Sequence, residues 1–257
     1  SKQQGFISLK NIILGVVLMT KNLRILSAIC VAAAVLTPLS ANAIGDSEIN
    51  SNSGSYWNEK SVEYDKVIHN WVKYYDLFIE NIVKSIPYNE NESIRILDLG
   101  SDTGNVSVSI IEKFKNAEFC CVDISDVALD VCKERLKNHS VSIIKSDIRN
   151  SEIFKENTYD LIVSNLAIHH IKDNEKEELY TLINNALKEN GYVVVGETMK
   201  YEDSKIAENF GVAQLEEHKS HPCSLFKQFK ILENSGFDNI DCAWKTLNFG
   251  VFCARKI

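Results

Sequence analysis

One segment constrains the fold of this chain more than any other, the run Ile96-Leu97-Asp98-Leu99-Gly100-Ser101-Asp102-Thr103-Gly104. Its apolar first half predicts a short buried strand, and its glycines predict a turn that opens a helix. A helix that begins directly after a strand offers unpaired N–H groups to a bound anion. The segment therefore predicts an α/β sheet with a ligand at the carboxyl end of this strand.

Strand-like and helix-like segments alternate along the rest of the chain. Short apolar runs predict buried strands, and apolar residues at helical spacing predict helices between them. The expected strands are 94–99, 117–122, 141–145, 159–164, 192–196, 239–244 and 248–254, and the expected helices are 106–114, 127–136, 175–188 and 225–235, with Gly236 just after the last. This order predicts an α/β fold whose functional loops lie at the carboxyl ends of the strands.

The segment before the first strand predicts helices as well. Residues 58–86 carry apolar and aromatic side chains at helical spacing, so we expect one long or two shorter helices. Tyr56, Trp57 and Tyr64 are candidates for an aromatic cover over the site, although aromatic residues of an amphipathic helix more often belong to the core. Residues 199–221 have weak periodicity and are long for a connection, which makes them a candidate lid.

The first 45 residues differ from the rest of the chain. They carry four basic residues and no acidic one, and residues 46–55 are a Ser/Asn/Gly-containing stretch that predicts a linker to a domain of residues 56–257. Within this leader, residues 19–43 combine a basic start, an apolar run of about 12 residues and a small-x-small end, which is typical of a signal peptide. A wrong translation start or an uncleaved anchor would also explain the pattern.

Charge and cysteine usage limit the partners and the compartment. The net charge is −7, and without the leader the chain holds 24 basic against 35 acidic residues, so a nucleic-acid partner is not expected. The cysteines after the leader show no Cys-x-x-Cys or Cys/His metal spacing, so we expect no metal and free buried thiols typical of the cytoplasm. The leader instead indicates export or membrane anchoring, and membrane contact is expected through the leader alone.

Two further acids end the next two predicted strands. Asp123 lies 19 positions beyond Gly104, where nucleotide-binding α/β folds hold ribose hydroxyls. Asp147, followed by Ile148, ends the third strand. Each acid also has a simpler interpretation: Asp98 as a turn residue, and Asp123 as a helix N-cap in place of Ser125.

The set of motifs resembles the class I S-adenosylmethionine-dependent methyltransferases. Asp98, Gly100 and Gly104 match that family's acid-x-Gly-x-Gly-x-Gly loop. The resemblance covers roughly residues 56–257 and continues through VDIS (122–125), SDI (146–148), YDLIVSNLAIHHI (159–171), LKENGYVVVGE (187–197) and GFDNIDCAWKTLNFGVFCARK (236–256). The short N-terminal helices and the IHHI segment resemble the small-molecule branch of the family.

The resemblance implies a Rossmann-like three-layer sandwich with a seven-stranded, mostly parallel sheet and a final antiparallel hairpin strand between the fifth and sixth. It also implies S-adenosylmethionine as the cofactor. The residues that it implies for cofactor binding are Asp98, Gly100, Ser101, Asp102 and Gly104 at the methionine part, Asp123 with Ile124 at the ribose, Asp147 and Ile148 at the adenine, and Asn165 and Leu166 beside the methyl group.

The expected reaction is transfer of a methyl group to a small organic acceptor. His169, His170 and Glu197 are the candidate catalytic or substrate-binding residues, although a histidine pair near a strand end can also be a hydrogen-bonded loop. A degenerate cofactor-binding protein and a protein or tRNA methyltransferase are the alternatives. A dehydrogenase is disfavoured because the glycines are spaced G-x-x-x-G rather than G-x-G-x-x-G. A DNA amino-methyltransferase is disfavoured because Asn165 is followed by Leu-Ala-Ile.

One residue departs from the family pattern. Asp102 stands where the middle glycine is expected, and its side chain is expected to crowd the cofactor. Its charge would repel the methionine carboxylate and attract the sulfonium. We expect Asp102→Gly to keep or improve cofactor binding.

Overall fold

The computed structural model describes residues 49–61, 63–211 and 220–257. The leader of residues 1–45 and its signal-like segment 19–43 lie outside the described residues, as does the middle of the candidate lid. Among the residues described, no helix is long and apolar enough to cross a membrane.

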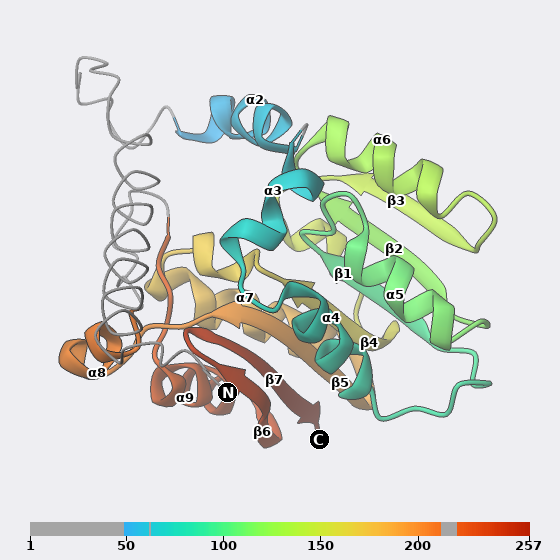
Figure 1. Ribbon diagram of the computed structural model, residues 1–257. Coiled ribbons are helices and arrows are strands. Elements are labelled where there is room, and N and C mark those ends of the chain that lie inside the picture. The colour runs from blue at the N-terminus through green and yellow to red at the C-terminus, as the bar shows by residue number, and fades with distance from the viewer. Residues whose placement is uncertain (1–48, 62, 212–219) are drawn as a thin grey trace, which may run out of the picture. The chain divides into compact units, whose positions relative to one another are not determined.

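Helices and strands alternate in the order that the sequence predicts (Figure 1). The strands are β1 (Arg95–Leu99), β2 (Glu118–Asp123), β3 (Val141–Lys145), β4 (Tyr159–Asn165), β5 (Leu187–Thr198), β6 (Phe237–Thr246) and β7 (Phe249–Lys256). The helices are α2 (Ile49–Ser61), α3 (Tyr64–Trp71), α4 (Tyr75–Lys84), α5 (Asn105–Lys113), α6 (Asp126–Arg135), α7 (Asp173–Ala186), α8 (Ser204–Asn209) and α9 (Leu225–Asn234), with 3₁₀ turns η1 (Ser151–Ile153) and η2 (Ile168–His170).

The seven strands form one sheet in the order β3-β2-β1-β4-β5-β7-β6. The first five of these are parallel, and β7 runs antiparallel between β5 and β6. The expected architecture, a Rossmann-like sandwich with a final antiparallel strand between the fifth and sixth, is confirmed. Because the sheet is parallel through β1, β2 and β4, the carboxyl ends of these strands meet at one edge.

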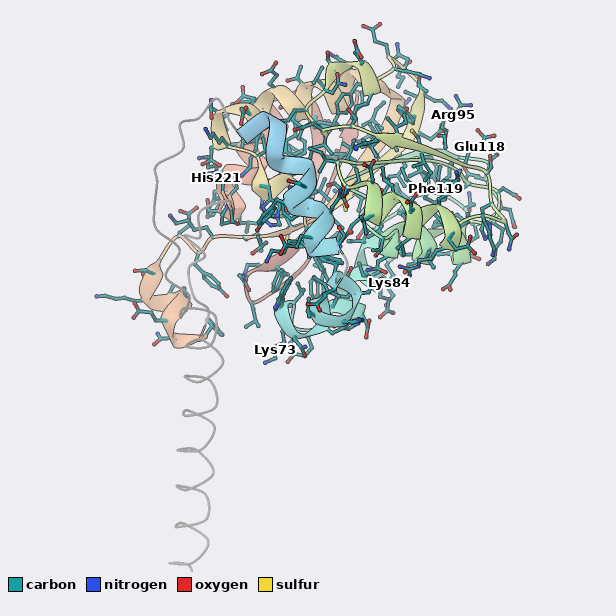
Figure 2. All side chains as sticks on the ribbon, turned by 90° about the horizontal axis from the view of Figure 1, so that it is seen from above. Lys73, Lys84, Arg95, Glu118, Phe119 and His221 are labelled. Atoms are coloured by element: carbon teal, nitrogen blue, oxygen red, sulfur yellow. The ribbon has the colours of Figure 1, made fainter. Side chains whose placement is uncertain are left out.

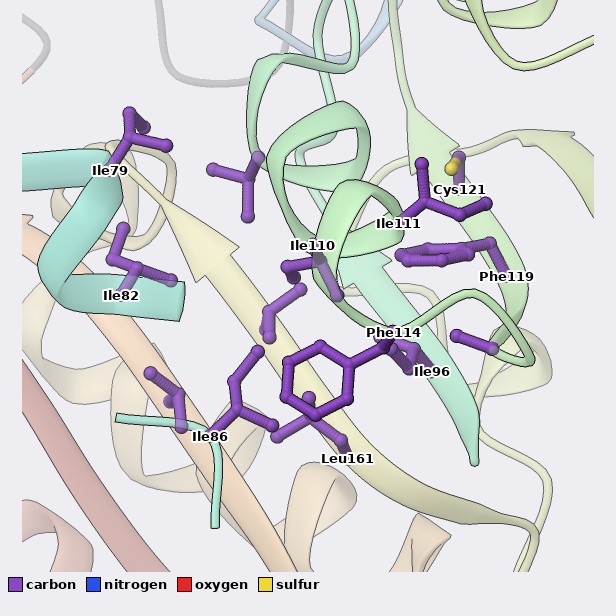
Figure 3. Packing of buried hydrophobic residues seen from close by; sticks show 14 of the residues in the cluster. Ile79, Ile82, Ile86, Ile96, Ile110, Ile111, Phe114, Phe119, Cys121 and Leu161 are labelled. Atoms are coloured by element: carbon purple, nitrogen blue, oxygen red, sulfur yellow. The ribbon is translucent and has the colours of Figure 1, made fainter. Parts of the chain in front are cut away.

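Each face of the sheet packs against its own hydrophobic layer. One layer includes side chains of α4 and α5 together with Ile96 of β1, and Figure 3 shows Phe114, Ile82 and Leu161 pointing into it. The other includes side chains of α7 and α9 together with Leu97 and Leu99. Alternate residues of one strand thus enter opposite layers, which is the period-2 pattern of a strand buried on both faces.

Neighbouring cysteines illustrate this alternation. Cys121 packs in the layer of α4 and α5, whereas Cys120 packs in the layer of α7. The six cysteines of the described residues are free, as expected, and four of them are buried.

Several boundaries differ from the expected ones. Residues 49–55, expected to belong to a linker, form the first turns of α2. A Cβ on Gly54 would stand 3.5 Å from the Ile124 carbonyl oxygen, an ordinary van der Waals contact, so α2 passes close to the connection after β2. The expected helical region 58–86 is divided into α2, α3 and α4, and a left-handed residue, Tyr74, precedes α4. Tertiary packing here overrides the weak helix propensity of Ser, Asn and Gly.

The end of the chain follows the prediction closely. Helix α9 ends at Asn234, and Gly236 has a φ of 85°, the left-handed conformation that commonly follows a helix. Helix α7 ends at Ala186 rather than at residue 188, because β5 already begins at Leu187.

Candidate functional site

The turn after β1 has left-handed backbone conformations that residues other than glycine rarely adopt. Gly100 and Gly104 have φ values of 70° and 85°. A Cβ on Gly100 would lie 2.4 Å from the Cβ of Ala167, and one on Gly104 would lie 2.9 Å from the Sγ of Cys132. Glycine is therefore required at both positions, and the turn is held tightly between the end of β4 and helix α6.

Asp98 lies beneath this turn and is 1% exposed. The hydroxyl of Ser107, on α5, donates a hydrogen bond to its Oδ2 at 2.6 Å. Burial raises the pKa of Asp98 to about 7, and the nearby charge of Asp123 acts in the same direction, while the Ser107 hydrogen bond opposes the shift. A bound cation would favour the ionised form of this carboxyl.

Asp123, at the end of β2, accepts two main-chain hydrogen bonds. The N–H of Asp102 donates to Oδ2 at 2.9 Å, and the N–H of Ser125 donates to Oδ1 at 2.8 Å. Burial raises the pKa of Asp123 although these hydrogen bonds lower it. The second acid thus holds the glycine turn in place, a contact that the sequence did not indicate.

The Asp102 side chain faces the N-terminal helices. Its φ is 45°, and Ser61 at the end of α2 contributes a side-chain hydrogen bond. Burial and the charge of Asp123 raise its pKa to about 7. Its charge also acts on Tyr64, whose pKa is raised mainly by burial.

Asp147 is engaged by a neighbouring side chain. Arg149 donates from Nη2 to Oδ2 at 2.7 Å and from Nε to Oδ1 at 3.0 Å, and also contacts Glu175 at 3.3 Å. Burial opposes ionisation, but the Arg149 hydrogen bonds and charge hold the pKa of Asp147 below its usual range. Ile148 packs against the layer of α7.

The segment after β4 lies against the glycine turn and, like that turn, contains a residue with positive φ. Leu166 has a φ of 54°, and its N–H donates to the Gly196 carbonyl at 2.8 Å. Three buried polar atoms in the two segments have no hydrogen-bond partner: Ser101 Oγ, Asp102 Oδ1 and Asn165 Oδ1. Buried polar atoms without partners are uncommon in folded proteins, and here they mark where a polar ligand would complete the structure.

Glu197, at the end of β5, organises the turn that carries the histidines. Its Oε1 accepts the N–H groups of Ala167 and Ile168 at 3.2 and 2.7 Å, and its Oε2 accepts the His169 N–H at 3.2 Å. The same Oε2 lies 2.7 Å from His169 Nδ1. Glu197 is 4% exposed, and these four contacts tie its carboxylate to the histidine turn.

The second histidine lies against an aromatic side chain of α2. The rings of His170 and His169 are 4.0 Å apart, and the ring of Trp57 meets that of His170 edge-on at 4.7 Å. Tyr56 in turn meets Trp57 at 5.1 Å. Trp57 therefore connects α2 to the histidine turn, as a cover over the site would require.

Helices α2 and α3 are fastened to the sheet edge by two polar residues. Asn58 Oδ1 accepts from the Ser125 hydroxyl at 2.8 Å. Asp65 Oδ1 accepts from Thr103 Oγ1 at 2.8 Å and from Asn105 Nδ2 at 2.9 Å, next to the start of α5. Tyr64, a candidate for the cover, is partly buried and packs against the layer of α4 and α5.

The sequence predicted the acids and glycines of this site but not their supports. Asn58, Asp65 and Ser107 carry no sequence signal that separates them from ordinary helix residues, because their partners lie far away along the chain. Asp98, Asp102, Asp123 and Asn165 are brought to one edge as expected. Within the described part of the chain, no group of His, Cys, Asp and Glu side chains could hold a metal ion.

Relatives with known names match most of the chain. A family model described as a methyltransferase domain matches residues 96–191. Proteins named carboxy-S-adenosyl-L-methionine synthase, from Campylobacter lari and Nautilia profundicola, are each 24% identical. The matches cover 75% and 77% of this chain and 90% and 96% of those relatives.

Solved structures share the fold at low sequence identity. Human N-acetylserotonin methyltransferase in complex with S-adenosylmethionine superposes with a TM-score of 0.62 at 14% identity, over 83% of this chain and 60% of that one. Phosphoethanolamine N-methyltransferase 2 of Haemonchus contortus gives 0.59 at 18% identity, over 80% and 58%. Residues 96–191 therefore match a methyltransferase domain, and the chain shares the fold of S-adenosylmethionine-dependent methyltransferases.

Proposed function

We propose that this protein transfers the methyl group of S-adenosylmethionine to a small organic acceptor at the carboxyl ends of β1, β2 and β4. The observation that carries the proposal is the meeting of the two strained segments, at Gly100 and Leu166, around three unpartnered polar atoms. Bound S-adenosylmethionine supplies a methyl group activated by its sulfonium. The protein then has to align donor and acceptor, which can contribute roughly 7–11 kcal/mol at the favourable limit.

The residues present fit this cofactor. The glycine turn offers close backbone approach, and Ser101 Oγ and Asn165 Oδ1 offer partners to the polar methionine end. Asp98 and Asp102 favour the positive sulfonium and amino groups, because a bound cation stabilises their ionised forms. The Asp102 carboxylate accepts a hydrogen bond from Ser61 of α2, and its unpartnered Oδ1 remains for the cofactor.

The acid at the end of β2 is the proposed ribose ligand. Each oxygen of Asp123 accepts one main-chain hydrogen bond, and a carboxylate oxygen has capacity for a second. Asp147 and Ile148 are proposed to border the adenine, with Arg149 holding the Asp147 carboxylate in place. Ile124, next to Asp123, lies beneath Gly54 of α2.

His169 is the proposed proton acceptor where the acceptor group is protonated. Glu197 occupies its Nδ1, which leaves Nε2 as the ring nitrogen for the substrate. His170 is proposed to contact the substrate together with Trp57 and Tyr56. The cover formed by α2 and α3 favours a small acceptor over a macromolecule, and the acidic body disfavours nucleic acid.

Calorimetry with S-adenosylmethionine and its demethylated product tests the cofactor step. Wild-type protein should bind both, Asp98→Ala and Asp123→Ala should bind weakly, and Asp130→Ala, an exposed acid of α6, should match wild type. A panel of small acids, amines and phenols then tests transfer by mass spectrometry. Wild-type protein that binds neither nucleoside would disprove the proposal, and binding with no product on any acceptor would favour a degenerate cofactor-binding protein.

The names of the relatives favour a second candidate, synthesis of carboxy-S-adenosyl-L-methionine, because the matches span nearly the whole length of those proteins. The two reactions leave different nucleosides. Methyl transfer yields the demethylated nucleoside, whereas the second reaction yields a nucleoside heavier by a carboxyl group. Mass spectrometry of the nucleoside that co-purifies with the protein separates them.

A further inference from the structure

Lys176, on α7, is 1% exposed and is the one buried lysine or arginine of the residues that the structure describes. Removing an ammonium group from water is costly unless its hydrogen bonds are replaced. The hydrogen-bond partners of the Lys176 ammonium group must therefore offset the cost of burying its charge.

The ammonium group of Lys176 has three partners, one for each of its N–H bonds. It donates to the main-chain carbonyl of His221, and to Asp173 Oδ1 at 3.1 Å. The Sγ of Cys223 lies 3.3 Å away. Two of these partners lie at the end of the candidate lid, His221 as its last residue and Cys223 just after it.

His221 carries the connection to the proposed catalytic histidine. Its N–H donates to the His169 carbonyl at 2.5 Å, while its own carbonyl accepts from Lys176. Figure 2 shows His221 on the opposite side of the molecule from Arg95 and Glu118, which lie at the amino ends of β1 and β2. One continuous chain of hydrogen bonds thus joins Lys176, His221 and His169 at the functional end of the sheet.

The same ammonium charge acts on Glu197. Burial opposes ionisation of Glu197, but the charge and hydrogen bond of His169, the Ile168 N–H and the charge of Lys176 together hold its pKa below the usual range. The other groups facing this cluster are Tyr180, whose pKa burial raises, and the pair of Asp173 with Lys227.

We propose that Lys176 is a positioning residue for His169, acting through the His221 carbonyl and through the charge that it presents to Glu197. The proposal rests on the proposed role of His169. The His169 turn is then held from two sides. The Glu197 carboxylate contacts His169 Nδ1 and accepts from three main-chain N–H groups, and the His221 N–H donates to the His169 carbonyl. Both holds depend on one buried ammonium group.

Ordinary packing does not account for this arrangement. The segment of Cys223 is already joined to Lys200 by a main-chain hydrogen bond of 2.9 Å, and Asp173 already pairs with Lys227 at the surface. A methionine in place of Lys176 would fill similar space without a charge. The ammonium group is required only for the direction of its hydrogen bonds and for its charge.

The test compares Lys176→Met with two controls, all in the full chain. Lys227→Met removes a surface cation from the same Asp173. Tyr180→Phe, on the same helix, removes the hydroxyl that accepts from Gln228 at 2.7 Å, and so lowers stability without touching His221. Nitrogen NMR of the histidine rings, assigned with His169→Gln, reports which nitrogen of His169 carries the proton and needs no acceptor. Lys176→Gln serves if the methionine variant fails to fold.

In Lys176→Met, the His169 ring signals should show mixed tautomers, and kcat should fall by about tenfold to a hundredfold while KM for S-adenosylmethionine stays unchanged. Both controls should keep the wild-type ring signals. Unchanged His169 signals in Lys176→Met, or equal changes in Tyr180→Phe, would overturn the positioning role alone. Wild-type protein that binds no S-adenosylmethionine would overturn the proposed function and the positioning role with it.

Discussion

The carboxylate of Asp123 accepts a hydrogen bond from the main-chain N–H of Asp102, with 2.9 Å between N and Oδ2. The acid that ends β2 therefore supports the turn that follows β1, in addition to its proposed contact with the ribose. Two roles on one side chain lead to a prediction in which stability and binding change together.

Asp123→Ala should lower both the free energy of unfolding and the affinity for S-adenosylmethionine. Hydrogen bonds to a charged group contribute about 1.5–3 kcal/mol, so an affinity loss of tenfold or more is expected. Calorimetry and thermal unfolding measure the two effects, with Asp130→Ala as the exposed control. Loss of stability with full affinity would show that Asp123 supports the turn and does not bind the cofactor.

The free energy of unfolding should fall as pH rises from about 4 to about 7. Asp98 and Asp102 have their pKa raised to about 7, chiefly by burial, so the folded protein binds protons there that the unfolded chain releases. Asp102→Asn should flatten this dependence. Thermal unfolding at pH 5 and pH 8 at constant ionic strength is the measurement, and higher stability at pH 8 would contradict the prediction.

Gly100→Ala should lower the free energy of unfolding more than Gly211→Ala does. Both glycines have positive φ, 70° and 65°, so both variants lose roughly 1–2 kcal/mol to the left-handed backbone. A Cβ at Gly211 meets nothing within 4 Å, whereas one at Gly100 meets Ala167 at 2.4 Å. The additional loss should be about 1–3 kcal/mol from overpacking. The double variant with Ala167→Gly should recover it, and equal losses in the two single variants would show that the steric contact contributes nothing.

Glu197→Gln should destabilise the protein by about 1.5–3 kcal/mol, since the amide keeps one acceptor oxygen where the carboxylate uses two. Cofactor affinity should change little, because the side-chain hydrogen bonds of Glu197 go to Ala167, Ile168 and His169 of the histidine turn. Denaturant unfolding and calorimetry measure the two quantities. Glu178→Gln, an exposed residue of α7, is the control, and a variant as stable as wild type would disprove the positioning role of Glu197.

Asn58→Ala should loosen α2 from the sheet edge. The lost hydrogen bonds to Ser125 and to the Val127 N–H support the start of α6, and loss of such a cap costs about 1 kcal/mol. Hydrogen exchange in α2 and dissociation of S-adenosylmethionine should both become faster. Asn70→Ala, exposed on α3, should leave both rates unchanged, and slow dissociation in Asn58→Ala would contradict a cover role for α2.

Local patterns predicted the elements of the sheet well. The expected strand 141–145 matches β3, and the expected boundaries of β1, β2 and β4 lie within one residue of those in the structure. The start of α2 at Ile49 was missed, because Ser, Asn and Gly favour a linker when read locally. Hydrogen bonds of Asn58 with Ser125 and Val127 stabilise a helix there, and a local pattern contains no information on such contacts.

The sequence by itself determined the strand that carries Asp98, the glycine turn after it and the acid Asp123, because each depends on residues adjacent in the chain. Only the tertiary structure decided what surrounds His169. The parallel register pairs Asn165 with Gly196, which places Glu197 beside a histidine 28 positions earlier. Lys176 reaches the carbonyl of His221 across 45 positions. Such contacts follow from strand order and packing, so they have no counterpart in the spacing of residues along the chain.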